Sequence, residues 1–293
     1  MLSQTAWGAT AAKSRAALSI AFTALPVWHA EAVTELEKEP RAAVAELPAS
    51  RNPRSLQPRT PRERARARTV ADIIRLGRQH LAVHGAAALS LRAVARDLGV
   101  VSSAVYRYVE NRDELLTLLL IDAFGELGDE VDAAVAAVPE VDHVGRFCAL
   151  GRAVRAWAMR EPASYALLFG SPVPGYEAPA ERTTGPGTRV IVTLVGLLDA
   201  AARAGRLKVG EPGVGDIPAA LGADLSAIRS QFNLDMSERM VARGVLVWSA
   251  LFGAVSFEVF NQYGPDTFSA PDELFDYHLR VLAGVAGLLS QEG

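Results

Sequence analysis

Residues 89–116, LSLRAVARDLGVVSSAVYRYVENRDELL, constrain the fold more than any other segment of this chain. Ser90 suits a helix N-cap, and apolar residues then recur at helical spacing at Leu91, Val94, Ala95 and Leu98. Gly99 follows as a residue that can end a helix with a positive φ, and residues 102–108 form a second amphipathic run. Two short helices with a glycine turn describe either a DNA-reading helix-turn-helix or an ordinary helical hairpin, and the pattern alone leaves both open.

The identities of the side chains around this turn are more specific. The pattern L-x-x-x-A-x-x-L-G-V at 91–100 is followed by Y-R-Y-V-E-N-R-D-E-L-L at 106–116. Together they resemble the DNA-binding domain of the TetR family of transcriptional regulators. The resemblance covers about residues 64–128 through these motifs, and the rest of the chain through its length and helical layout.

This resemblance implies an all-α fold, in which a three-helix helix-turn-helix DNA-binding domain precedes a larger helical ligand-binding and dimerisation domain. We therefore divide the chain into an extension with a Pro/Arg-rich linker at 1–58, a DNA-binding domain at 59–112 and a helical body at 113–293. The expected partners are double-stranded DNA, a small-molecule effector and a second copy of the chain.

The family's DNA-contacting positions correspond to seven residues of this sequence, which are Arg92, Ser102, Ser103, Tyr106, Arg107, Tyr108 and Arg112. Arg92 and Arg107 can each present a planar fork to the O6 and N7 atoms of guanine. Tyr106 and Tyr108 are expected to hydrogen-bond phosphates, which would hold the second helix in register. Arg112, at the start of the next helix, is expected to contact a phosphate.

The segment departs from the family pattern at two positions. Val101 stands where a Ser or Thr cap is usual, so we expect Ser102 to cap the second helix and to shift its start by one residue. Tyr108 stands where His is common, which leaves its DNA contact open.

The charge distribution supports a polyanionic partner for one part of the chain. The whole chain has a net charge of -3, but residues 51–110 contain 12 arginines and no lysine against four acidic residues. That block therefore carries a net charge of +8, whereas residues 111–293 are acidic overall. A basic arm at 59–68 could track phosphates or reach a neighbouring groove, or it could simply be a solvated face.

The first fifty or so residues have two readings. Lys13 and Arg15, an apolar run at 16–27 and the pair Ala30 and Ala32 mimic a secretory signal peptide. Pro26 interrupts that run, and export would separate a DNA-binding domain from its DNA. We favour a disordered extension, or translated sequence upstream of the natural start, and a cytoplasmic protein. The single cysteine, Cys148, fits a reducing compartment.

The body is expected to be helical throughout. Apolar periodicity predicts helices at 114–138, 143–160, 162–170, 188–206 and 216–231, with a Pro/Gly loop at 171–187. Two long apolar helices follow at 237–263 and 271–289. Because these two are hydrophobic over much of their circumference, we predict a homodimer through about 237–289.

A ligand pocket is expected between the middle helices. Its candidate lining residues are aromatic, and they are Phe147, Trp157, Tyr165, Phe169, Trp248 and Phe252. Each of them could equally be ordinary core. The runs at 156–170 and 247–253 resemble a ligand-domain subgroup marked by Trp, His and Gly, although Phe252 replaces the His. A mainly apolar pocket favours a hydrophobic or aromatic effector.

Several other classes of protein are disfavoured. There is no nucleotide-binding glycine motif, no G-x-S-x-G elbow and no clustered His/Asp/Glu set, so we expect neither an enzyme nor a cofactor. His80 and His84 have the spacing of a metal pair, but no third ligand lies nearby, so we expect no metal. No apolar run approaches the ~20 residues that cross a bilayer, so we expect no membrane. The expected function is a ligand-responsive repressor that binds a palindromic operator as a homodimer, and the alternative is an architectural or interaction protein that binds DNA without sequence preference.

Overall fold

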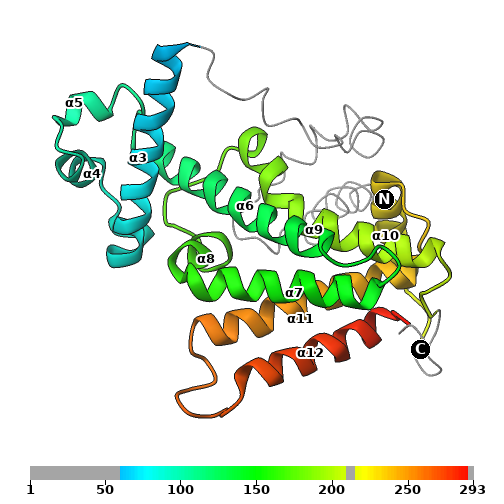
Figure 1. Ribbon diagram of the computed structural model, residues 1–293. Coiled ribbons are helices and arrows are strands. Elements are labelled where there is room, and N and C mark those ends of the chain that lie inside the picture. The colour runs from blue at the N-terminus through cyan, green and yellow to red at the C-terminus, as the bar shows by residue number, and fades with distance from the viewer. Residues whose placement is uncertain (1–59, 209–214, 290–293) are drawn as a thin grey trace, which may run out of the picture.

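The computed structural model describes residues 60–208 and 215–289, and all the elements within them are helices. The expected all-α fold is therefore confirmed. Helix α3 spans Pro61–His84, and the short η2 spans Ala86–Ala88. The next two helices are α4 at Leu91–Asp97 and α5 at Ser102–Val105. These elements form the head at one end of the molecule (Figure 1).

Helix α6, Arg112–Ala136, runs from the head through the middle of the body (Figure 1). It packs on one side against α7, His143–Arg160, and on another against α9, Ala180–Arg203. The short α8, Pro162–Phe169, contacts both α3 and α6. A core helix that reaches into the head links the position of the head to the packing of the body.

The last three helices complete the body. They are α10 at Ala219–Phe232, α11 at Glu238–Val259 and α12 at Pro271–Ala286. Helices α11 and α12 lie beneath α7 in Figure 1, and both pack against it. Leu207 and Leu288 form an isolated antiparallel bridge, which joins the segment after α9 to the end of α12.

Most predicted helix boundaries agree with the structure to within a few residues, and the predicted range 143–160 coincides with α7. Local signals explain this agreement. The Asp142 side chain accepts a hydrogen bond from the Gly145 amide at 2.8 Å, which caps α7, and Pro162 begins α8 where its missing N–H is not needed.

The predicted loop at 171–187 is wrong in its second half, because α9 begins at Ala180 and contains Pro186. Two contacts lie in the first turn of this helix. The Arg182 guanidinium binds the Glu114 carboxylate at 2.6 and 3.0 Å, and the Thr183 hydroxyl donates to the Pro179 carbonyl at 2.8 Å. The segment also buries Thr183, Gly187 and Val190, so tertiary packing overrides its low helix propensity.

Two helices are longer and more apolar than expected for a chain without membrane spans. By length and composition alone, α9 and α11 could cross a bilayer, although core helices of soluble proteins pass the same test. The expectation that no apolar run approaches that length is therefore wrong by this criterion. Both helices pack against other helices of the body, and the absence of a membrane partner stays a prediction.

The predictions for the N-terminal extension, the Pro/Arg-rich linker and the start of the basic arm fall on residues 1–59, outside the described residues. The proposed division at 58 and 112 likewise stays a prediction.

Candidate nucleic-acid interface

The head is held together by a small apolar core. Ile73 of α3, together with Val94 and Ala95 of α4, is fully buried. Val105 and Val109, on either side of the turn after α5, are buried in the same core. Because these two valines anchor α5 and its following turn, Tyr106 and Arg107 between them are exposed to solvent.

The turn between α4 and α5 has the predicted geometry. Gly99 has a φ of +74°, a conformation that other residues rarely adopt, and the Gly99 amide donates to the Arg96 carbonyl at 3.0 Å. The angle between the two helices therefore depends on the glycine that the sequence pattern singled out.

The predicted cap of the second helix is wrong. Ser102 is the first residue of α5, Val101 occupies the N-cap position, and neither side chain makes a capping hydrogen bond. Val101 has extended backbone dihedrals, and its carbonyl accepts the first helical hydrogen bond from Ala104 at 2.9 Å. The backbone thus starts the helix without a polar side chain. Helix α5 is also shorter than expected, because residues 106–108 form turns.

The predicted base-reading arginines have free guanidinium groups. Arg92, at the start of α4, and Arg107, after α5, are exposed. Within residues 60–208 and 215–289, neither guanidinium makes an ion pair or a side-chain hydrogen bond. Ser103 and Tyr106 are exposed beside Arg107, and Ser102 is half-buried. These five residues are available to a DNA groove.

Tyr108 and Arg112 are less available. The Arg66 guanidinium lies over the Tyr108 ring, 5.3 Å from its centroid, and Tyr108 is half-buried against the core. Arg112 donates to the carbonyl oxygens of Ala86 at 3.0 Å and Ala87 at 3.4 Å. Arg112 therefore ties α6 to η2, and a phosphate would have to share its guanidinium with these carbonyls.

Arg66 was not predicted as an individual DNA contact, although it lies in the predicted basic arm at 59–68. It belongs to the first turns of α3, where Arg62, Arg64 and Arg68 are also exposed. The Thr60 side chain and Glu63 form a capping box that fixes this end of the helix. The arginine spacing at 62–68 was the signal that could have identified Arg66.

The histidine pair has a structural role. His80 Nε2 lies 2.6 Å from the Asp97 carboxylate, so it joins α3 to the end of α4. This contact lowers the pKa of Asp97, chiefly through the hydrogen bond to His80. The His84 ring packs edge-on against the His80 ring. Among the described residues, no group of three or more His, Cys, Asp or Glu could hold a metal ion.

Ion pairs connect the head to the body. Arg78 of α3 contacts three carboxylates of the body, those of Asp122 at 3.1 Å, Glu161 at 3.3 Å and Glu126. Arg182 of α9 holds Glu114 in the first turn of α6. Burial raises the pKa of the Asp122 carboxyl, and the nearby Arg78 opposes that shift. A change in the body can thus reach the head through α3 and α6.

The six aromatic residues predicted to line a ligand pocket form a packed core. Four of them form a chain of ring contacts, with centroids 5.0 Å apart for Tyr165 and Phe169, 4.6 Å for Phe169 and Phe252, and 4.2 Å for Phe252 and Trp248. Phe147 and Trp157 of α7 are fully buried in the same hydrophobic core.

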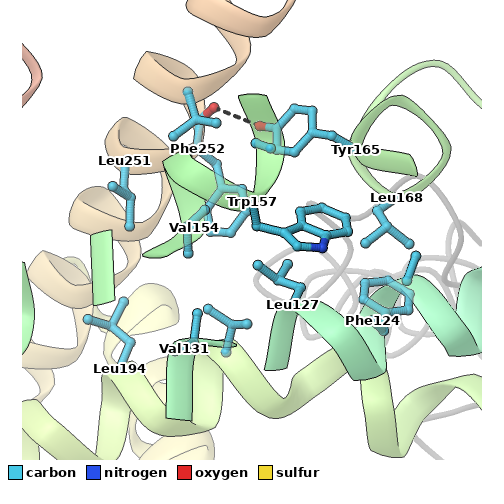
Figure 2. Close-up of a cluster of buried hydrophobic side chains, with 14 of the residues drawn as sticks. Phe124, Leu127, Val131, Val154, Trp157, Tyr165, Leu168, Leu194, Leu251 and Phe252 are labelled. Atoms are coloured by element: carbon cyan, nitrogen blue, oxygen red, sulfur yellow. Dashed lines mark hydrogen bonds between the residues drawn. The ribbon is translucent and has the colours of Figure 1, made fainter. Parts of the chain in front are cut away.

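Two polar atoms lie inside this aromatic core (Figure 2). The Tyr165 hydroxyl donates to the Phe252 carbonyl at 3.2 Å and lies 2.8 Å from the Ser256 hydroxyl. Burial raises the pKa of Tyr165 to about 12. The Trp157 indole nitrogen, among Phe124 and neighbouring leucines in Figure 2, has no hydrogen-bond partner. The aromatic residues therefore act as core in this structure.

Comparisons with known proteins agree with this arrangement. The model of bacterial regulatory proteins of the tetR family matches residues 73–119, and the model of the tetracyclin repressor-like C-terminal domain matches residues 147–282. HTH-type transcriptional regulators of Mycobacterium bovis and Mycobacterium tuberculosis are 45% identical over 225 residues, which cover 76% of this chain and 94% of theirs.

Solved structures show the same similarity. The regulatory protein SCO4313 is 33% identical in sequence, and its structure matches with a TM-score of 0.62. The match covers 77% of this chain and 100% of the SCO4313 chain. A protein from Rhodococcus sp. RHA1 shares the fold, with a TM-score of 0.52 at 20% identity. That match covers 73% of this chain and 94% of the Rhodococcus chain.

Proposed function

The chain belongs to the TetR family of transcriptional regulators, and on this premise we propose that it is a ligand-responsive repressor that binds a palindromic operator as a homodimer. It is a helix-turn-helix DNA-binding protein and not an enzyme. We place it in the cytoplasm, where its DNA partner lies.

The observation that carries the proposal is the exposure of the DNA-reading side chains on a firmly anchored turn. Val105 is buried, and the neighbouring Ser103, Tyr106 and Arg107 are exposed together. We assign base readout to Arg107 and Arg92, because a free guanidinium fork can satisfy two acceptors of guanine. We assign phosphate contacts to Tyr106, Ser102 and Ser103.

Tyr108 and Arg112 receive a supporting role in this proposal. Tyr108 holds Arg66 over its ring, so Arg66 joins the phosphate contacts at the edge of the head. Arg112 fixes α6 against the turn that precedes α4, and its Nη1 atom lies 3.4 Å from the Asp113 carboxylate, so a phosphate would compete with that carboxylate.

A homodimer through α11 and α12 is supported by the apolar residues that these helices expose. Leu246 is 57% exposed, Tyr277 59% and Val281 45%, and Phe257 adds a further aromatic ring. Exposed apolar residues on two adjacent helices are typical of an interface that a symmetric copy covers. The resulting four-helix bundle would set the distance between the two heads.

Ligand response is supported by the ion pairs that connect the body to α3 and α6. An effector that shifts α6 or α9 would move the two α5 segments relative to each other, and their separation must match half-sites about one helical turn apart. The six aromatic residues remain our proposal for the apolar centre of the effector domain. Because they are packed together, a ligand among them would have to displace a ring, and half-buried Phe169 is the one to move.

Selection of bound duplexes from a random DNA pool tests the proposed function. We expect enrichment of a palindrome whose half-sites are centred about one helical turn apart, bound by two chains. Two results would instead favour the architectural alternative. The selection would recover unrelated sequences uniformly, and unlabelled competitor DNA would abolish binding.

A further inference from the structure

A small cavity lies beneath α10 and shares no lining residue with the aromatic core. It has a volume of about 40 Å³, and its walls come from α9, α10 and α11 with the loop before α11. The lining residues are apolar throughout, and they include Val195, Leu198, Ile228, Phe232, Met236 and Gly244. No lining side chain carries a charge or a hydrogen-bonding group stronger than the thioether of Met236.

We propose that this cavity is a second effector site, separate from the aromatic core, for an uncharged aliphatic molecule, with α10 as its movable cover; the proposal rests on the ligand response proposed above. Apolar cavities exclude water and bind apolar molecules, whereas an unpaired polar group buried in them is strongly disfavoured. A volume of about 40 Å³ holds only the end of an alkyl chain. A longer chain therefore requires α10 to move outwards, and the flexible Met236 side chain can adjust around it.

Helix α10 is held to the body by few contacts. It buries only Leu225 and Ile228, and it packs mainly against α11. Its polar attachment is the Glu238 carboxylate in the first turn of α11, which pairs with Arg229 and accepts a hydrogen bond from the Ser226 hydroxyl at 3.1 Å. These solvent-accessible contacts can break without exposing the main core.

The loop that follows α10 is fixed more firmly. The buried Asp199 carboxylate of α9 accepts hydrogen bonds from the backbone amides of Asp235 at 2.7 Å and Met236 at 3.0 Å. Between this anchor and α10 stands Asn233, in the left-handed conformation with φ +48°. We infer that α10 pivots at Asn233 while the anchored loop keeps the start of α11 in place.

Helix α9 can carry the effect of a ligand to the head. Val195 lines the cavity, and Arg182 lies 13 residues earlier on the same helix, roughly 20 Å away at 1.5 Å per residue. Arg182 holds Glu114 in the first turn of α6, which directly follows the DNA-reading segment. A ligand that pushes Val195 and Leu198 outwards would therefore shift this turn.

Two probes with the same chain length test the chemistry of the site. We would titrate the full-length protein with 1-octanol and with octane-1,8-diol, and measure binding by calorimetry. The diol differs by one hydroxyl, which the cavity would bury without a partner. We expect 1-octanol to bind with one molecule per chain, and the diol to bind at least about tenfold more weakly.

Two matched glycine variants test the location. A Cβ added at Gly244 would lie 3.5 Å from Leu198 Cδ1, so Gly244→Leu would fill the cavity from α11. Gly196 on α9 is exposed, and a Cβ there meets nothing within 4 Å, so Gly196→Leu is the control. We expect Gly244→Leu to weaken 1-octanol binding at least tenfold and Gly196→Leu to leave it unchanged. If Gly244→Leu does not fold, Gly244→Ala and Gly196→Ala replace the pair, with a smaller expected loss.

The effector role of the cavity is tested by measuring the affinity of the protein for the duplex recovered by selection, with and without 1-octanol. A weaker affinity in the presence of 1-octanol, lost in the Gly244 variant, supports the proposal. Equal 1-octanol binding by both glycine variants, or equal binding of the diol, would overturn the site. Binding of 1-octanol without any change in DNA affinity would overturn its effector role. A protein that fails to bind any selected duplex even without probes would count against the proposed function instead.

Discussion

The arginines of the DNA-reading segment differ in what surrounds them. Arg107 is exposed beside Tyr106, whereas the Arg112 guanidinium already donates to the Ala86 and Ala87 carbonyls. A side chain held by the protein is well placed to fix orientation but has fewer donors left for a base. Because sequence discrimination requires a free fork in the groove, the two residues should contribute differently to affinity and specificity.

Replacing these two arginines separates base readout from positioning. Arg107→Ala should weaken binding to the selected operator roughly 10- to 100-fold and change binding to random DNA much less, since a bidentate contact is worth ~1–3 kcal/mol. Arg112→Ala should weaken binding to both DNAs. Fluorescence anisotropy on the two duplexes measures this, and equal losses for Arg107→Ala would remove it from base readout.

Buried Tyr165 should make stability fall in alkaline solution. Its pKa in the folded protein is about 12, above the ordinary value of 10.0, because burial disfavours the phenolate. Below pH 10 both states keep the proton and stability does not depend on this group. Between pH 10 and 12 only the unfolded state loses the proton, so the free energy of unfolding should fall by up to about 1.4 kcal/mol per pH unit.

Denaturant titrations at pH 9, 10 and 11 measure this alkaline loss. Tyr165→Phe is the control, because it lacks the titrating hydroxyl. At neutral pH its free energy of unfolding should be lower by about 1 kcal/mol, because the hydrogen bonds to Phe252 and Ser256 are lost. In alkaline solution its free energy of unfolding should fall less steeply with pH than that of the wild type. The same slope in both proteins would contradict the assignment.

The helices of the body approach one another most closely where small residues allow it. Gly151 of α7 faces α12, and a Cβ there would lie 2.3 Å from Leu279 Cδ2 and 3.4 Å from Leu251 Cδ1. Leu279 and Leu251 are both fully buried, so neither side chain can move aside freely. The close packing of α7 against α11 and α12 therefore depends on this glycine.

Gly151→Ala should destabilise the protein by ~1–3 kcal/mol, because the added methyl group overpacks a fully buried site. Gly125→Ala in α6 is the matched control, since a Cβ there meets nothing within 4 Å. The free energy of unfolding of this control should be unchanged or up to ~1 kcal/mol higher, because alanine has a higher helix propensity than glycine. Urea unfolding compares the two, and a neutral Gly151→Ala would show that α12 can move away from α7.

On the scale of the whole molecule, the basic head and the acidic body are joined by α6 and by ion pairs on both sides of it. Arg78 connects α3 to carboxylates of α6 and of the turn before α8, and Arg182 connects α9 to the start of α6. Partly exposed pairs contribute little to stability individually. Together they join α3 and α9 to α6.

A charge placed on the proposed dimer face should separate the two chains. Leu246→Arg on α11 should give a folded monomer, because this side chain is exposed within one chain, and it should lose tight binding to the palindromic duplex. Leu221→Arg on α10, where the leucine is 45% exposed, is the control and should remain dimeric. Sedimentation equilibrium at micromolar concentration measures the oligomeric state of each variant. A monomeric wild-type protein would refute the proposed interface.

The sequence alone determined the helical fold and the place of the DNA-reading segment, because both depend on local signals. Apolar residues at helical spacing, the positive φ that Gly99 adopts and the Asp142 cap of α7 act within a few residues of the chain. The exposed Arg92 and Arg107 could likewise be identified from the motif.

Contacts between distant residues were decided only by the tertiary structure. Helix α9 continues through Pro186, with Thr183, Gly187 and Val190 buried on either side of it, and Arg182 binds Glu114, 68 residues away in the sequence. Arg112 turns towards the carbonyl oxygens of η2, and the expected ligand-lining aromatic residues pack against one another. The cavity beneath α10 exists because three helices meet there without filling the space between them. No local pattern encodes such a space, since it depends on how side chains from separate helices pack together.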